Sequence, residues 1–129
     1  LPLSSNNYDR EQAAKGLIDL LYLQNTFAGN KVFIKNILRQ FVTQYPLELE
    51  ELAISIKSRD IAKVKTQSHN MKTTISTLNN ESLILADLEA MESFENNASN
   101  WVIIDHKMNM LMQYKDALLK EAGSIIQSL

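Results

Sequence analysis

The chain has 129 residues, of which 45% are hydrophobic and 22% charged, and this length is that of one domain with a sizeable core. Three glycines and two prolines are too few for the many tight turns of a β-sandwich, barrel or propeller. The absence of cysteine excludes disulfides, thiolate metal sites and a thiol nucleophile, and a net charge of −2 argues against nucleic acid as a partner.

The N-terminal part of the chain predicts an arm followed by a short helix. Residues 1–10 are polar and lack periodicity, so we expect a linker or extended arm, with the folded domain covering 11–129. A helix is predicted over about 11–27, and Gly29 is suited to the left-handed conformation that follows a helix end. Its expected apolar face consists of Leu17, Leu20, Leu21 and either Leu23 or Gln24.

A long helix is predicted over about 31–57, because apolar residues recur there at intervals of three and four. Pro46 lies inside this pattern. The pattern continues beyond it, so we expect a bend near Gln44–Tyr45 rather than an end. The predicted buried stripe comprises Phe33, Ile34, Ile37, Leu38, Phe41, Val42, Tyr45, Leu49, Leu52, Ala53 and Ile56.

Three more helices are predicted in the second half of the chain. The first covers about 60–78, with Asp60 as a good N-cap. The others cover about 81–95 and 101–126, with a loop at 96–100 between them. Short joints favour antiparallel neighbours, so the predicted fold is all-α: an antiparallel up-down-up-down four-helix bundle with an additional short N-terminal helix. The seam of the helix over 60–78 is Ile61, Val64, Ser68, Met71, Ile75 and Leu78.

Metal chemistry is disfavoured by the surroundings of the two histidines. A di-iron bundle needs Glu-x-x-His motifs, but Thr66 lies three residues before His69 and Ile103 three before His106. The HExxH motif of zinc proteases is also absent. We therefore expect no metal in this domain, and we interpret His106 as a surface residue.

His69 is the candidate for chemistry, because it lies one position away from the predicted buried seam, where a partner can reach its ring. A neutral imidazole is a good nucleophile near pH 7, and an ammonium at Lys72 would stabilise a phosphoryl group on it. A lone histidine at such a position is more often an ordinary boundary residue, so the pattern leaves both interpretations open. Residues on the same side of the helix, mostly small, are Lys65, Thr66, Lys72, Thr73 and Ser76.

Residues 68–79, SHNMKTTISTLN, resemble the signature of histidine-containing phosphotransfer (HPt) domains. That family shows a small residue, His, two variable positions, Lys, usually Gly, a small residue, and then Leu-Gly. Residues 33–45 resemble the family's second helix, and Asp60 lies where the family has an Asp that opens the histidine helix. Residues 83–89 resemble the following helix with its Leu-Glu ending, and the likeness covers about 17–122.

The resemblance implies a phosphorelay carrier in two-component signalling. His69 would accept a phosphoryl group through Nε2 from the aspartyl phosphate of a response-regulator receiver domain and pass it to another receiver aspartate, and Lys72 would support the phosphate. The receiver would supply Mg²⁺, so the domain would need no cofactor or ATP site of its own and would not be an enzyme by itself. The receiver would dock on a surface that includes Lys65, Thr66, Thr73 and Ser76.

Two residues depart from the family pattern. Thr73 stands where the family usually has Gly after the lysine, and it adds bulk where a receiver must approach. Asn79 replaces the Gly of Leu-Gly, a mild change because Asn tolerates the left-handed conformation.

Two other functions are alternatives to phosphotransfer. The dimerisation helix of a sensor kinase usually carries an acidic residue directly after its histidine and a Pro shortly beyond. Here Asn70 follows His69, and no Pro follows Pro46. The other alternative is a non-catalytic helical interaction bundle with a silent histidine. Its core would look the same, so only phosphorylation of His69 distinguishes it from an HPt domain.

The first residue is Leu rather than Met, so we expect one domain of a longer protein, with the C-terminal domain of a hybrid sensor histidine kinase preferred. No signal peptide is recognisable, and no apolar stretch approaches the roughly 20 residues that span a bilayer. We expect a cytoplasmic domain without direct membrane contact, including the case of a tail on a membrane-bound kinase. Each long helix has one apolar stripe that the bundle can bury, which favours a monomer.

Overall fold

The computed structural model describes residues 17–129, and its regular structure there is entirely α-helical, as the turn-poor composition predicted. The predicted arm at 1–10 and residues 11–16 of the helix predicted over 11–27 lie outside the described residues. Residues 17–19 are described and are not helical, because Asp19 caps a helix that begins only at Leu20. The described helices are α2 (Leu20–Thr26), α3 (Lys31–Lys57), α4 (Ile61–Leu78), α5 (Leu83–Ser93) and α6 (Ala98–Ser128).

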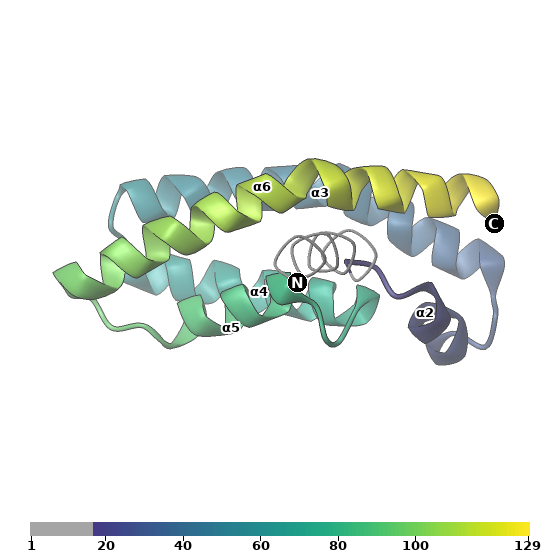
Figure 1. The fold of residues 1–129 in the computed structure, drawn as a ribbon, viewed down its shortest axis with the longest axis horizontal. Helices are drawn as coiled ribbons and strands as arrows, with labels where there is room; N and C mark the ends of the chain where they lie inside the picture. Colours follow the sequence, from purple (N-terminus) through teal and green to yellow (C-terminus); the bar gives the residue numbers. More distant parts are fainter. Residues whose placement is uncertain (1–16) are drawn as a thin grey trace, which may run out of the picture.

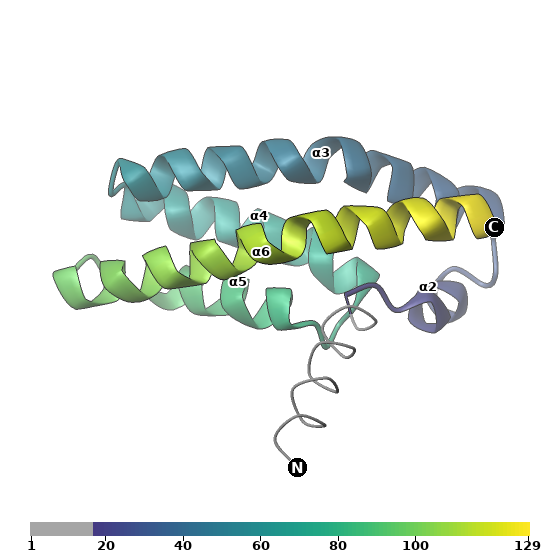
Figure 2. The same cartoon turned by 45° about the horizontal axis from the view of Figure 1, so that its top comes forward.

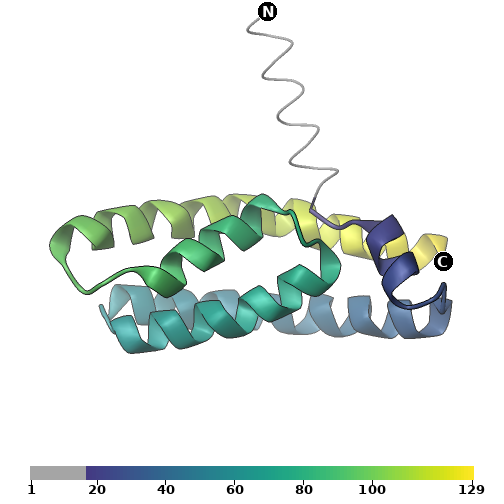
Figure 3. The same cartoon turned by 90° about the horizontal axis from the view of Figure 1, so that it is seen from below.

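The four longer helices enclose a common core. Helices α3 and α6 lie side by side along the molecule, and α4 packs between α3 and α5 (Figures 1 and 2). Helix α5 also contacts α6, so the contacts run from helix to helix around the core. The short α2 lies at the end where α3 begins and α6 ends, and it contacts α3 and α4 (Figures 1 and 3).

Side-chain caps explain where the longer helices begin. The Asn30 side chain accepts a hydrogen bond of 3.1 Å from the Phe33 amide, and Asp60 accepts one of 3.2 Å from the Lys63 amide. Each cap satisfies a backbone donor that has no partner inside the helix. The predicted bounds of α3 and the predicted cap of α4 are thereby confirmed.

The predicted bounds of α5 and α6 were wrong by two or three residues. Ser82 caps α5 through a 3.0 Å bond from the Leu85 amide, so the helix begins at Leu83 rather than 81 and ends at Ser93 rather than 95. Asn97 caps α6 through a 2.8 Å bond from the Asn100 amide. Helix α6 therefore begins inside the segment predicted as a loop and runs on to Ser128.

Helix α3 passes through Pro46 and continues to Lys57, as the uninterrupted apolar pattern predicted. Proline removes one backbone hydrogen bond, and the buried residues on both sides of it keep the helix on the core. The bend expected at Gln44–Tyr45 stays a prediction. The buried residues of α3 are Ile34, Leu38, Phe41, Tyr45, Leu49, Leu52, Ser55 and Ile56.

The seam predicted for α4 is buried over most of its length. Val64, Ser68, Met71, Ile75 and Leu78 are all buried, and Ile61 at the first turn is half-buried. Burial of this seam fixes the rotation of α4 about its own axis, and therefore fixes which residues of α4 face solvent.

Two residues predicted on buried faces are exposed instead. Leu21 is 66% exposed because Leu23 occupies the face of α2 that meets the core. Phe33 is 46% exposed because Ile34 takes the core position, and its ring packs edge-on against Phe27 with 5.0 Å between ring centroids. In both helices the apolar residues cover a wider arc than the face that meets the core, so one apolar residue is left exposed.

Replacing the cap of α4 should weaken the helix that carries His69. Asp60→Ala removes the acceptor for the Lys63 amide, and such losses cost about 1 kcal/mol. Denaturant titration should therefore give a free energy of unfolding lower by about that amount. Asp116→Ala, a change at an exposed aspartate in the middle of α6, is the matched control and should leave stability unchanged. Equal stability of the two variants would contradict this role of Asp60.

Candidate functional site

His69 lies on the solvent side of α4, directly after the buried Ser68. Its side chain is 59% exposed, whereas Ser68 is fully buried. One residue turns the helix by about 100°, which carries the imidazole from the core seam to the boundary with solvent. The ring is therefore accessible to solvent, as its place beside the predicted seam indicated.

Glu92 of α5 binds two side chains of α4 with its two oxygens. Oε1 lies 2.6 Å from Nδ1 of His69, and Oε2 lies 2.7 Å from Nζ of Lys72. His69 and Lys72 are three residues apart on α4, so both reach the same side of the helix. The three side chains form one connected polar group across the α4–α5 contact.

The contact with Glu92 fixes which ring nitrogen of His69 is available. An ionised carboxylate can only accept hydrogen bonds, so Nδ1 must carry the proton in the 2.6 Å contact. In the neutral ring the lone pair then lies on Nε2. Nε2 therefore carries the free lone pair, and it belongs to a side chain that is more than half exposed.

Glu92 remains charged at neutral pH. The Lys72 ammonium, and after it the His69 ring, hold the pKa of the Glu92 carboxyl below its usual value of 4.5. The same contact raises the pKa of Lys72. Because the pKa of Glu92 is lowered in the folded chain, the stabilisation is complete above pH 4.5 and is lost as the pH falls through the lowered pKa.

The surface around the ring combines small hydroxyl residues with the charged side chains of Lys65, Lys72 and Glu92. Thr66 and Thr73 are exposed, and Lys65 and Ser76 are half-buried. The hydroxyls bond back to the helix: Thr66 Oγ1 donates to the Ala62 carbonyl, Thr73 Oγ1 to the His69 carbonyl and Ser76 Oγ to the Thr73 carbonyl. The protons of the threonine hydroxyls are thus used within α4, and next to the imidazole a partner would meet threonine methyl groups together with the charged Lys72 and Glu92.

Glu92 was not predicted from the sequence. The contact joins residues 23 apart in the chain, and helical spacing predicts only neighbours on the same helix. The available signal was an acidic pair, Glu89 and Glu92, on one side of the helix that follows the histidine helix.

Residues 17–129 contain no group of three His, Cys, Asp or Glu side chains placed to hold a metal ion. His106, the second histidine, is exposed on α6. None of the described helices is long and apolar enough to cross a membrane. Comparisons of the chain with protein-family models, with curated proteins and with solved structures found no match.

The tautomer of His69 should depend on Glu92. In the wild-type chain above pH 7, long-range ¹H–¹⁵N NMR spectra should show the Nδ1–H form, because Glu92 accepts that proton. Glu92→Leu removes the acceptor and should shift the ring toward the Nε2–H form. Glu89→Leu, a change one turn earlier on α5, should leave the tautomer unchanged. An Nε2–H ring in the wild-type protein would contradict the assignment.

Proposed function

We propose that this chain is an HPt-like phosphoryl-group carrier of a two-component phosphorelay. It would accept a phosphoryl group on His69 from a receiver aspartyl phosphate and return it to another receiver aspartate. The observation that carries the proposal is the pairing of an exposed imidazole with Glu92, which binds Nδ1 and leaves Nε2 for reaction. The sequence resemblance over residues 68–79 supports it independently of that geometry.

The transfer step balances without a base in this domain. Nε2 of His69 forms a bond to phosphorus as the phosphorus–oxygen bond to the aspartate breaks, and the aspartate leaves as a carboxylate. Nδ1 keeps its proton, so the phosphorylated ring carries a positive charge. The Glu92 carboxylate already lies 2.6 Å from Nδ1 and would stabilise that charge. In the reverse step, a receiver aspartate carboxylate bonds to phosphorus as the bond from phosphorus to Nε2 breaks, and the ring becomes neutral again.

Lys72 would stabilise the phosphoryl oxygens without leaving Glu92. Its ammonium has three N–H donors, and the 2.7 Å contact with Oε2 uses one of them. Glu92 would therefore hold the lysine in place for a phosphoryl group that arrives on the neighbouring ring. The partner receiver would supply Mg²⁺ and the acidic pocket, and the phosphotransfer chemistry here would require no nucleotide.

The architecture that fits this role is an antiparallel up-down-up-down four-helix bundle. Packing of α4 against α3 and α5, together with the contacts of α6 with α3 and α5, supports this arrangement. We further propose a cytoplasmic, monomeric domain of a hybrid sensor histidine kinase. An interaction bundle with a silent histidine is the alternative, but such a bundle would have no need for a carboxylate that orients an exposed ring.

His69→Gln should abolish phosphoryl uptake and leave the fold intact. The glutamine side chain lacks the nucleophilic nitrogen, and the exposed position makes the expected loss of stability less than about 1 kcal/mol. The measurement is incorporation of label from a receiver charged with radiolabelled acetyl phosphate, with helix content followed by circular dichroism. His106→Gln is the matched control and should retain uptake. A His69→Gln protein that takes up label at the wild-type rate would overturn the proposal.

Lys72→Ala should slow transfer while keeping the nucleophile. Loss of a charge-assisted contact of roughly 1–3 kcal/mol corresponds to about one to two orders of magnitude in rate or in phosphohistidine lifetime. Lys65→Ala removes another lysine on the same side of α4 and should have a smaller effect. Single-turnover transfer kinetics provide the measurement. Unchanged kinetics for Lys72→Ala would remove the electrostatic role but leave His69 as the acceptor.

A further inference from the structure

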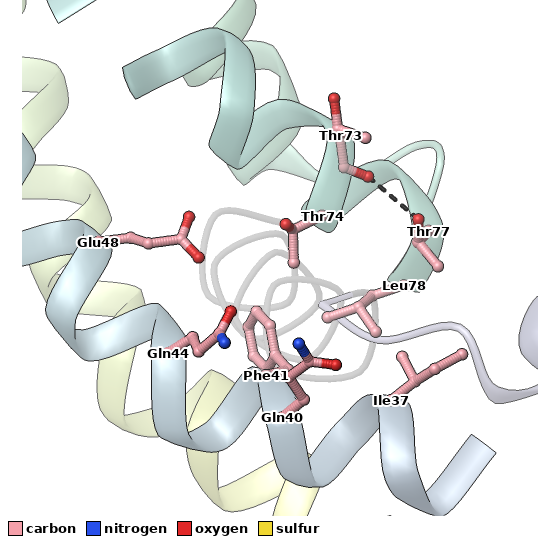
Figure 4. Close-up of a pocket in the computed structure, with 9 residues that line it drawn as sticks. All are labelled: Ile37, Gln40, Phe41, Gln44, Glu48, Thr73, Thr74, Thr77 and Leu78. Atoms are coloured by element: carbon pink, nitrogen blue, oxygen red, sulfur yellow. Dashed lines mark hydrogen bonds between the residues drawn. The ribbon is translucent and has the colours of Figure 1, made fainter. Parts of the chain in front are cut away.

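A groove of about 240 Å³ lies between α3 and α4, with an apolar floor (Figure 4). Ile37 and Phe41 contribute to the floor from α3, and Leu78 contributes from α4. Phe41 is 3% exposed and Leu78 is 1% exposed, so the floor is the edge of the core itself. A floor of this kind accepts an aliphatic side chain.

The α4 wall of the groove continues the surface that carries His69. It is built from Thr73, Thr74 and Thr77, and Thr73 lies one turn beyond His69. Four residues of helix correspond to about 6 Å along the axis. A protein that covers the imidazole would therefore also cover the mouth of the groove.

The other end of the groove is acidic. Glu48 lines the groove and also an adjoining hollow of about 200 Å³, which Glu51 lines as well. In Figure 4 the Glu48 side chain extends from α3 toward Thr74. Burial, and then the charge of Glu51, raise the pKa of Glu48. Within residues 17–129, no ion pair includes either glutamate.

We propose, on the basis of the phosphotransfer function above, that this groove selects the receiver through an aliphatic side chain and a Lys or Arg about 10 Å from it. Phe41 and Glu48 are seven residues apart on α3, which corresponds to about 10 Å along the helix. The aliphatic side chain would enter over the floor formed by Ile37, Phe41 and Leu78. The cation would reach the two carboxylates of Glu48 and Glu51 at the far end.

Charge complementarity supports this occupant. Two carboxylates one turn apart repel each other, and burial of one of them adds a desolvation cost. A partner's cation would relieve both costs when the groove closes. Complementary charges at such a site affect mainly partner choice and association. Glu48 and Glu51 would therefore determine specificity without taking part in the transfer at His69.

The test uses the receiver domains encoded in the genome of origin, each phosphorylated with radiolabelled acetyl phosphate. The receiver that charges wild-type His69 fastest is then titrated against the double variant Glu48→Gln/Glu51→Gln. We expect the KM for this receiver to rise by about tenfold with kcat unchanged, and the salt dependence of transfer to weaken. Glu50→Gln/Asp116→Asn removes two exposed charges that line neither hollow and should match the wild type.

The outcomes separate this proposal from the function on which it rests. Label on wild-type His69 with an unchanged KM in the double variant overturns the groove proposal and leaves phosphotransfer standing. No uptake from any receiver overturns both. Sedimentation of the wild type as a dimer that the double variant abolishes would make a second copy of the chain the occupant, and would also overturn the proposal. A charge swap would establish the contact. Glu48→Lys should raise the KM, and replacing one Lys or Arg of the receiver with Glu should restore it.

Discussion

Glu92 binds His69 and Lys72 of α4 from a neighbouring helix, and the properties of the candidate site depend on this contact. Without it, His69 would be an exposed ring with either tautomer available, and Lys72 would be a free lysine on a solvated face. With it, one ring nitrogen holds a proton, the other is available, and the ammonium is kept beside the ring.

The core of the protein places Glu92. Leu88, one turn before Glu92, and its neighbour Met91 are fully buried, so they fix the rotation of α5 and leave Glu92 at the edge of the core, in contact with α4. Lys107 of α6 binds Asp87 at 3.2 Å and holds α5 from its other side. Helix α4 is fixed in the same way by its seam, and Asp60 fixes where it begins. The polar group at the surface therefore results from apolar packing beneath it, and the groove beside Thr73 results from the contact of α4 with α3.

Local signals in the sequence predicted the elements that depend on local physics. The bounds of α3, the cap at Asp60 and the seam from Val64 to Leu78 could all be inferred from residue type and spacing. The start of α6 could not, because the segment NNASN offers several asparagines as possible caps and residue type alone does not choose between them. Asn97 caps the helix, while Asn96 Oδ1 accepts a 2.7 Å bond from Nε1 of Trp101. Glu92 was missed for the related reason that a pair between two helices leaves no periodic trace in the chain.

The most direct test of this account is to identify the phosphorylated atom. The domain would be charged by a phosphorylated receiver, and ³¹P NMR with ¹H–¹⁵N correlation would assign the nitrogen that bears phosphorus. The account predicts an acid-labile phosphoryl group on Nε2 of His69, because Glu92 occupies Nδ1. A phosphoryl group on Nδ1, or on any residue other than His69, would contradict it.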